Sequence, residues 1–373
     1  MSLVAIKSAI DTLSAPTISF TILTVLFPFF FPPSDWFEKI HRKLGFWRLW
    51  TKAGGITGLV LITSFFVIGY YDKNFNITLT KADNFPIVLM IYSMFFFIWL
   101  GMYKAYRNDI RIDQGLKPEE YNDPDDKVLV WPDLVYIEFI ALILFQVFLI
   151  VWSILVAAPI EEPANPASTP NPSKAPWYFL GLQEMLVYYD PWIAGVLLPT
   201  MIIVGLMAIP YMDINKKGDG YYSFKERRVG MFIFMYGWVV LWLFLIVIGT
   251  FFRGPNWNFF GPFEYWDIHK VEALTNVNLS ELLWVKLLNQ GLPSNIFIRE
   301  SVGFLSVSFY LFVLPVILAK TVLKDMYEAY GPTRYTSLMV FGLVMLALPI
   351  KMYLRWMINL KYIIAIPEWF FNI

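Results

Sequence analysis

The sequence contains no cysteine, and only two of its 373 residues are histidine. The absence of thiols excludes disulfide bonds, thiolate-ligated zinc, cysteine-held iron–sulfur clusters and thioether-attached haem within this chain. Charge is also scarce, because Asp, Glu, Lys and Arg make up 16% of the residues and their signs cancel. Without an excess of positive charge, the composition gives no reason to expect a nucleic-acid partner.

Apolar residues are abundant instead, at 58% of the chain, with 19% aromatic. A helix needs about 20 mostly apolar residues to cross a bilayer. We therefore expect an all-α integral membrane protein with about eight transmembrane helices, or seven if one of the weaker spans fails. Six spans are clear, and two at 17–33 and 336–350 are weaker; the clear ones are 55–71, 85–103, 134–157, 192–211, 230–252 and 303–323.

Basic residues orient these spans, because cytoplasmic loops carry an excess of Lys and Arg. The segments 34–52, 104–127 and 213–228 each carry five basic residues, which predicts that they are cytoplasmic. The long loops at 158–191 and 253–302 then face the outer side. The basic residues Lys351, Arg355 and Lys361 fit this rule poorly, and they either snorkel or face a protein interior.

The outer loop after the span 134–157 carries the densest pattern. Five prolines lie between Pro163 and Pro176, which excludes a helix and favours a stiff, extended path. An amphipathic stretch follows, from Trp177 to Asp190. Composition alone would give an interfacial loop with an aromatic belt.

The order of residues here resembles the carboxy-terminal domain of cytochrome b and subunit IV of the cytochrome bf complex. That family has a loop of the form P-A-[DN]-P-x-x-T-P-x-x-x-K-P-E-W-Y-F after a helix opened by W-P or H-P. The resemblance extends over about residues 128–252. The matching residues are Trp131-Pro132, Pro163-Ala164-Asn165-Pro166, Thr169-Pro170, Lys174 and Trp177-Tyr178-Phe179.

The resemblance divides the chain into three segments. Residues 1–125 are an amino-terminal membrane extension of about three helices. Residues 126–255 are the cytochrome b carboxy-terminal-like domain with a core of three spans. Residues 256–373 are an outer loop with one or two further helices.

The resemblance also implies half of a quinol-oxidation pocket on the outer side. In the family, the glutamate of P-E-W-Y accepts a quinol proton, but Ala175 and Pro176 occupy the aligned positions here. The usual acid is therefore missing. The residues that the resemblance places at the quinone are Pro176, Trp177, Tyr178, Phe179 and Gln183.

Glu184 is the predicted replacement for that acid. Quinol oxidation releases protons together with electrons, so a base near the hydroxyl is needed. Glu184 follows Trp177 by seven residues, which puts both on one face of a regular helix. The alternative is a solvated or salt-bridged carboxylate.

Glu138 lies early in the span that follows Pro132. In the family, an aspartate at this offset lines the quinone-reduction site on the cytoplasmic side. Acids within spans are costly and rarely face lipid. Glu138 either supplies protons to a quinone there or pairs with a neighbouring basic residue.

The two histidines, His41 and His269, fall in predicted loops, whereas two b haems need four histidines within spans. We therefore expect this chain to ligate no b haem and no metal by itself. The resemblance then implies a non-haem subunit of a quinol:cytochrome c oxidoreductase of the bc or bf type, not catalytic alone. It contributes to the quinol-oxidation pocket and to proton-coupled electron transfer.

The implied partners are a haem-bearing subunit like the amino-terminal half of cytochrome b, a Rieske-type iron–sulfur protein, a c-type cytochrome and membrane lipid. We expect a dimer of such a multi-subunit complex, in a bacterial inner, energy-transducing membrane. Two alternatives stay open. One is a secondary transporter, although the inverted repeats common in such proteins are not visible. The other is a scaffold subunit that kept the fold and lost the pocket.

Overall fold

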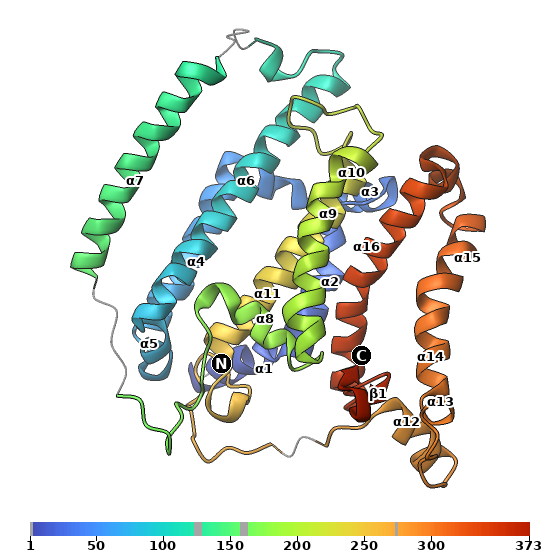
Figure 1. Ribbon diagram of the computed structural model, residues 1–373. Coiled ribbons are helices and arrows are strands. Elements are labelled where there is room, and N and C mark those ends of the chain that lie inside the picture. Colours follow the sequence, from blue (N-terminus) through green and yellow to red (C-terminus); the bar gives the residue numbers. More distant parts are fainter. Residues whose placement is uncertain (1–2, 123–128, 157–162, 273–274) are drawn as a thin grey trace.

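A computed structural model describes residues 3–122, 129–156, 163–272 and 275–373 (Figure 1). In these residues, seven helices are long and apolar enough to cross a membrane. Two of them are assembled from shorter helices joined by wider, π-type turns. The spans contain α4 (Lys52–Tyr70), α6 (Phe85–Asp113), α7 (Val135–Leu155), α9 (Leu198–Met212), α10 (Arg228–Met235) with α11 (Phe244–Val247), α14 (Ser301–Ser308) with α15 (Leu314–Lys320), and α16 (Lys324–Ile358).

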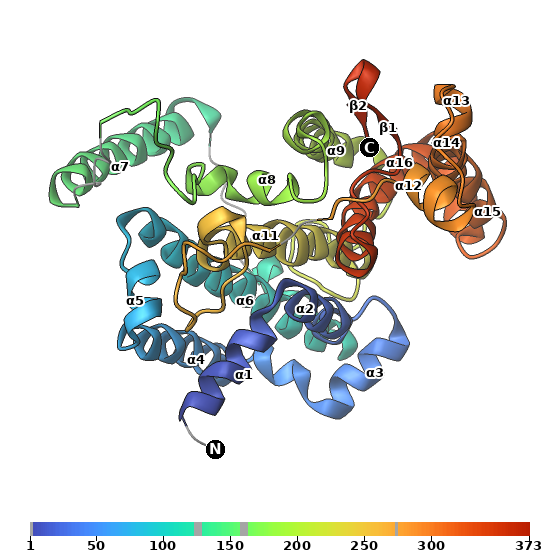
Figure 2. The same ribbon diagram turned by 90° about the horizontal axis from the view of Figure 1, so that it is seen from below.

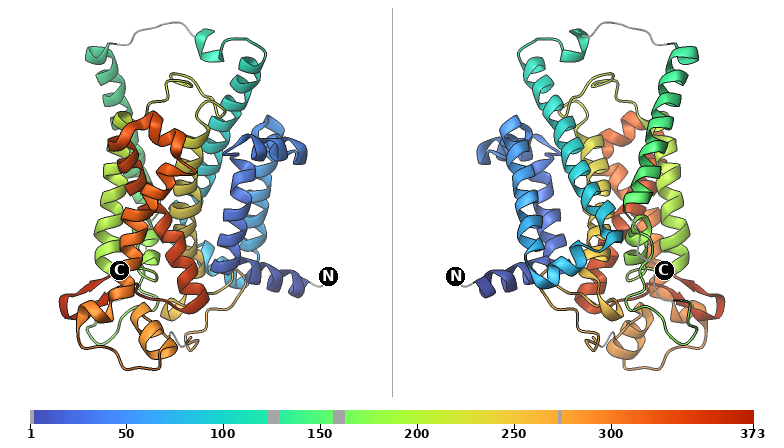
Figure 3. Two further views of the ribbon diagram at one scale, coloured as in Figure 1. Left: turned by 90° about the vertical axis from the view of Figure 1, so that its right-hand side faces the viewer. Right: turned by 90° about the vertical axis from the view of Figure 1, so that its left-hand side faces the viewer.

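A bent helix pair supplies the eighth candidate span. Helices α1 (Leu3–Ser14) and α2 (Pro16–Phe30) meet at an angle of 73°. The extended backbone of Ala15 makes the bend, and Pro16 opens α2 in the first turn, where proline is tolerated. Figure 3 shows α1 lying across the direction of the other helices. The predicted all-α membrane fold is confirmed, and each of the eight predicted spans coincides with a helix.

Short elements connect the spans. At the end predicted to be cytoplasmic, called the cytoplasmic end below, lies α3 (Asp35–Leu44), and at the opposite end lies α5 (Lys73–Leu79), whose first turn is capped by Asp72. The Asp72 carboxylate accepts bonds from two backbone N–H groups that the helix leaves unpaired. The other short elements are α8 (Leu180–Met185), α12 (Leu279–Glu281), α13 (Ile296–Arg299) and an antiparallel pair, β1 (Ala365–Ile366) with β2 (Phe371–Asn372).

The segments predicted to be cytoplasmic gather at one end of the bundle, uppermost in Figure 1. There Arg228 pairs with Glu38, and Lys225 pairs with Asp113. These ion pairs join the three basic segments of the sequence. The other end, which carries α5, α8 and α12, is called the outer end below.

The basic residues of the last span lie in the protein interior. Lys351 is 2% exposed and donates to the carbonyl of Lys361 at 2.7 Å. Arg355 donates to Asn359 O at 3.1 Å, and Lys361 donates to Leu186 O at 3.0 Å. These side chains satisfy carbonyl groups at helix ends, which explains why they do not follow the loop-charge rule.

One hydrophobic cluster draws on all three predicted segments. The ring of Phe20 in α2 lies 5.2 Å from that of Phe244 and 5.7 Å from that of Tyr353. The amino-terminal extension is thus packed against the span Arg228–Phe252. The predicted boundary between residues 125 and 126 lies outside the described residues, and the three-domain division stays a prediction.

Helix α7 differs from the rest because it stands apart from the bundle (Figures 1 and 2). None of the residues in its most apolar stretch is buried. Near its outer end, the ring of Trp152 lies 5.4 Å from that of Phe85 in α6. This span therefore offers nearly its whole apolar surface to its surroundings.

Candidate functional site

The proline-rich loop is fastened to the outer end by side-chain hydrogen bonds. Gln183 accepts a bond from the N–H of Ala175 and donates one to the carbonyl of Ser173, both at 2.8 Å. Asn171 accepts from the N–H of Asn256 at 2.7 Å. Because proline has no N–H to donate, these amide side chains fix the path of a loop that makes few backbone bonds.

A cavity of about 580 Å³ lies beside this loop. Its walls come from three parts of the chain that are distant in sequence: the turn before α6, the outer end of α7, and the loop itself. Such a volume falls in the range of small-molecule sites. The residues that carry the argument are Trp152, Trp177, Trp266, Lys174, Pro176 and the pair Lys81–Asp83.

Three tryptophans give the cavity aromatic walls, and polar and charged side chains, Lys81, Asp83 and Lys174 among them, line it as well. Lys81 and Asp83 form an ion pair at 3.4 Å, and both side chains are about half exposed. They are the most exposed charged groups among the residues that line the cavity. The arrangement suits a planar, apolar ring with a polar edge, because aromatic faces pack on the ring and the polar groups orient it.

Lys174 is the charged group on the inner wall. Its Nζ donates to the carbonyl of Thr250 at 2.6 Å and lies 5.0 Å from the ring centroid of Trp266. Burial, with a contribution from the nearby Lys81, lowers the pKa of Lys174 from 10.5 to about 7. The sequence did offer a signal for this residue, because Lys174 is the one basic residue in 158–191. The sequence analysis gave it no role.

Glu184 lies behind the cavity and does not line it. Its side chain is fully buried, and the guanidinium of Arg253 donates to both carboxylate oxygens: Nε to Oε2 at 2.9 Å and Nη2 to Oε1 at 2.6 Å. Trp257 Nε1 donates to it at 3.0 Å and Tyr188 Oη at 3.3 Å. A base needs a free acceptor site, so a proton-accepting role for Glu184 stays a prediction that requires this ion pair to open.

The structure brings only part of the predicted site together. Pro176 and Trp177 line the cavity, whereas Gln183 holds the loop from outside it. Tyr178 and Phe179 are about half exposed and do not line the cavity. Their roles at a quinone stay predictions.

Glu138 is exposed in the first turn of α7. Its carboxylate has neither an ion pair nor a hydrogen bond within the part of the chain that the structure describes. His269 is also exposed, whereas His41 lies in α3, is buried, and has its Nδ1 2.6 Å from Phe29 O. Among the described residues, no group of three or more His, Cys, Asp or Glu side chains is placed to hold a metal ion.

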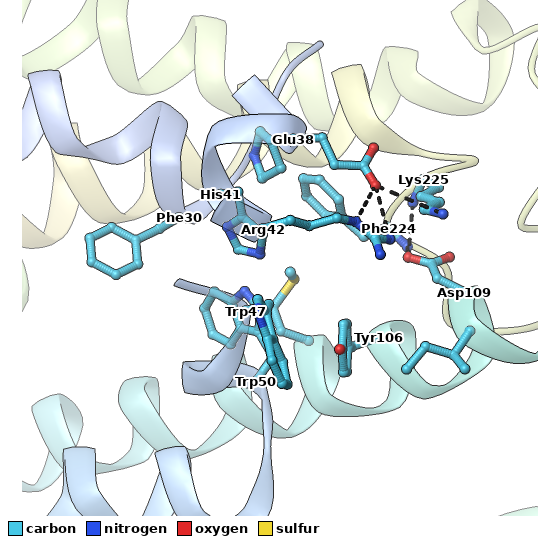
Figure 4. Close-up of a pocket in the computed structure, with 13 residues that line it drawn as sticks. Phe30, Glu38, His41, Arg42, Trp47, Trp50, Tyr106, Asp109, Phe224 and Lys225 are labelled. Carbon is cyan, nitrogen blue, oxygen red and sulfur yellow. Dashed lines mark hydrogen bonds and ion pairs between the residues drawn. The ribbon is translucent and has the colours of Figure 1, made fainter. Parts of the chain in front are cut away.

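A second, smaller cavity of about 280 Å³ lies at the cytoplasmic end, and the sequence analysis did not predict it (Figure 4). Aromatic rings form much of its wall, including Trp47 and Tyr106. Its carboxylates have polar partners: Glu38 pairs with Arg42 at 3.1 Å, and the buried carboxylate of Asp109 accepts the backbone N–H of Lys225 at 3.2 Å. Most of the lining comes from residues 1–125.

The proline-rich loop beside the outer cavity lies in a segment that matches a known protein family. Residues 163–263 match the family model described as cytochrome b(C-terminal)/b6/petD. No solved structure matches the chain. The match begins at the proline-rich loop, later than the resemblance that starts near residue 128, and it extends past the span Arg228–Phe252 into the turn that holds Arg253 and Trp257. Residues 163–263 of this multi-pass membrane protein are therefore similar to the carboxy-terminal domain of cytochrome b.

Proposed function

We propose that the outer cavity is this chain's half of a quinol-oxidation pocket, and that the chain is the non-haem membrane subunit of a quinol oxidoreductase of the cytochrome bc or bf type. The family match supports a cytochrome b-type subunit of a quinol oxidoreductase. The observation that carries the finer proposal is the placement of Pro176 and Trp177. Both belong to the family-matching segment, and both line a cavity of suitable size.

In this proposal the chain supplies shape, ring packing and proton handling. Trp177 and Trp266 would pack against the faces of the quinone ring, where aromatic pairs add to the energy of burial. The electrons would leave to groups on other subunits, because this sequence has no cysteine and two histidines. Those subunits would be a haem-bearing cytochrome b partner, a Rieske-type iron–sulfur protein and a c-type cytochrome, in a bacterial inner membrane.

The exposed α7 supports the partner part of the proposal. A span with none of its apolar core buried has room for neighbours on almost every side. It also closes one wall of the cavity through Trp152. A haem-bearing subunit seated against α7 would thus reach the same cavity.

A scaffold role is the alternative that one observation favours. The family's acid is missing at the aligned position, and both carboxylate oxygens of Glu184 accept hydrogen bonds from Arg253. A subunit with that arrangement and no other base would hold the complex together without acting on quinol. Quinone binding separates the two functions.

The test is quinol turnover and quinone-analogue affinity in the complex purified with its partners. Trp177→Ala removes a ring from the cavity wall, and burying such a side chain contributes about 1.5–3 kcal/mol. We expect analogue affinity to fall by about tenfold or more. Trp369→Ala is the matched control, because that ring is 60% exposed and lies away from the cavity.

Equal effects of the two substitutions would contradict the proposed pocket. An assembled wild-type complex that binds no quinone analogue would establish the scaffold role instead.

A further inference from the structure

One charged side chain of the outer cavity has no counter-charge. Within the described residues, no carboxylate lies within 4.0 Å of the Lys174 amine, and its only close polar partner is the carbonyl of Thr250. A carbonyl accepts one N–H and leaves the nitrogen lone pair free when the amine is neutral. The site therefore suits an uncharged lysine.

The charges around Lys174 also favour the neutral form of its amine. Lys81, on the turn before α6, lines the same cavity, and both it and Arg253, after α11, disfavour a positive charge on the amine. Glu184 opposes them, but its charge is already matched by Arg253. Asp83 is engaged with Lys81. The net field on the amine is thus repulsive to a proton.

The position of Lys174 is also close in sequence to the missing acid. It precedes Ala175 and Pro176, which occupy the aligned positions of the family's glutamate, and it lines the same cavity as Trp177. A ring packed on Trp177 would present its hydroxyl to a wall on which Lys174 is the remaining titratable group. Asp83 and Lys81 also line the cavity, but they form an ion pair with each other.

We propose that Lys174 is the catalytic base of the outer cavity and takes an O–H proton directly from quinol. This inference rests on the proposed function. In the step, the quinol O–H bond breaks, an N–H bond forms, and the neutral amine becomes an ammonium group. One electron leaves the ring at the same time to a one-electron acceptor on a partner subunit, the iron–sulfur cluster of the proposed complex.

The second proton and the second electron leave in the next step, once the amine is neutral again. The charge arrangement provides for that return. An ammonium at Lys174 is repelled by Lys81, and the exposed carboxylate of Asp83 lines the same cavity. The proton therefore leaves to the outer side. A base of this kind works best when its pKa is near the working pH, and the pKa of Lys174 is lowered to about 7.

The test compares Lys174→Arg with Lys174→Met in the purified complex. Arginine keeps the cation, the donor to Thr250 and the contact with Trp266, but it stays protonated and cannot accept a proton. We expect both variants to lose about 10²-fold or more in quinol turnover, with subunit assembly and quinone-analogue affinity retained in the arginine variant.

The pH profile provides the second readout. Wild-type turnover should rise with pH through about 7 and then level, because only the neutral amine accepts a proton. Lys81→Gln removes a neighbouring positive charge, which raises the pKa of Lys174, so the rise should move to higher pH.

Wild-type turnover in Lys174→Arg would overturn the inference while leaving the quinol pocket intact. A profile that Lys81→Gln does not move would also count against Lys174. If the wild-type complex neither binds nor oxidises quinol, the proposed function itself fails. Loss of activity in Glu184→Gln with an unchanged Lys174→Arg variant would assign the base to Glu184.

Discussion

The two ends of the molecule use charge differently. At the cytoplasmic end, partly exposed ion pairs such as Lys225–Asp113 join three segments of the chain. At the outer end, the buried pair Glu184–Arg253 lies near the cavity, and Lys174 in the cavity has no counter-charge within 4.0 Å among the described residues. Exposed pairs contribute little, a buried pair is costly to break, and a charge without a partner is available for chemistry. The contrast supports the proposal that quinol chemistry takes place at the outer end.

The largest effect should come from breaking the buried pair. Arg253→Gln leaves the carboxylate of Glu184 buried without its cation, which typically costs about 3–5 kcal/mol. We expect a large drop in the temperature at which the detergent-solubilised complex unfolds. The double variant Glu184→Gln/Arg253→Gln should recover part of the loss, because no uncompensated charge remains. Equal stability of the single and wild-type proteins would mean that the pair is open to water.

Releasing the loop should have a smaller, local effect. Gln183→Ala deletes both side-chain bonds to Ser173 and Ala175, each of which contributes about 1 kcal/mol. We expect faster hydrogen exchange in residues 163–176 and weaker quinone-analogue binding, with the unfolding temperature of the helices little changed. Unaltered exchange in that segment would show that the prolines alone hold the loop.

The smallest effect should come from the cytoplasmic end. Lys225→Gln removes the ion pair with Asp113, whose side chain is about half exposed. The free energy of unfolding should change by less than about 1 kcal/mol, and quinol turnover should not change. A turnover defect in this variant would contradict the assignment of the chemistry to the outer end.

The sequence predicted the spans well because hydropathy over about 20 residues is a local property. Even the weak span at 17–33 corresponds to a helix, α2, with its bend at Ala15. The isolation of α7 was not predictable, because a span has the same apolar composition whether it contacts other helices, lipid or another subunit. The sequence left two places open for Lys351, the membrane interface and the protein interior; its burial depends on the carbonyl of Lys361, past the end of its own helix.

The site was predictable only where the motif itself touches the cavity. The helical argument for Glu184 assumed a regular helix from Trp177, but Trp177–Phe179 form a tighter turn and α8 begins at Leu180. The changed register turns Glu184 toward Arg253, sixty-nine residues further on. Lys174 escaped notice for a related reason: its environment is made by Thr250 and Trp266, which the spacing of the loop does not reveal.

The most direct test of the outer pocket is labelling of the purified complex with a photoreactive quinone analogue, followed by mapping of the cross-linked peptides. The account predicts that label concentrates in the peptides around Trp177 and around Lys81–Pro86, the two segments that face each other across the cavity, and that excess unmodified quinone removes it. Label that gathers at the cytoplasmic cavity instead, or that spreads over all apolar helices without competition, would contradict it.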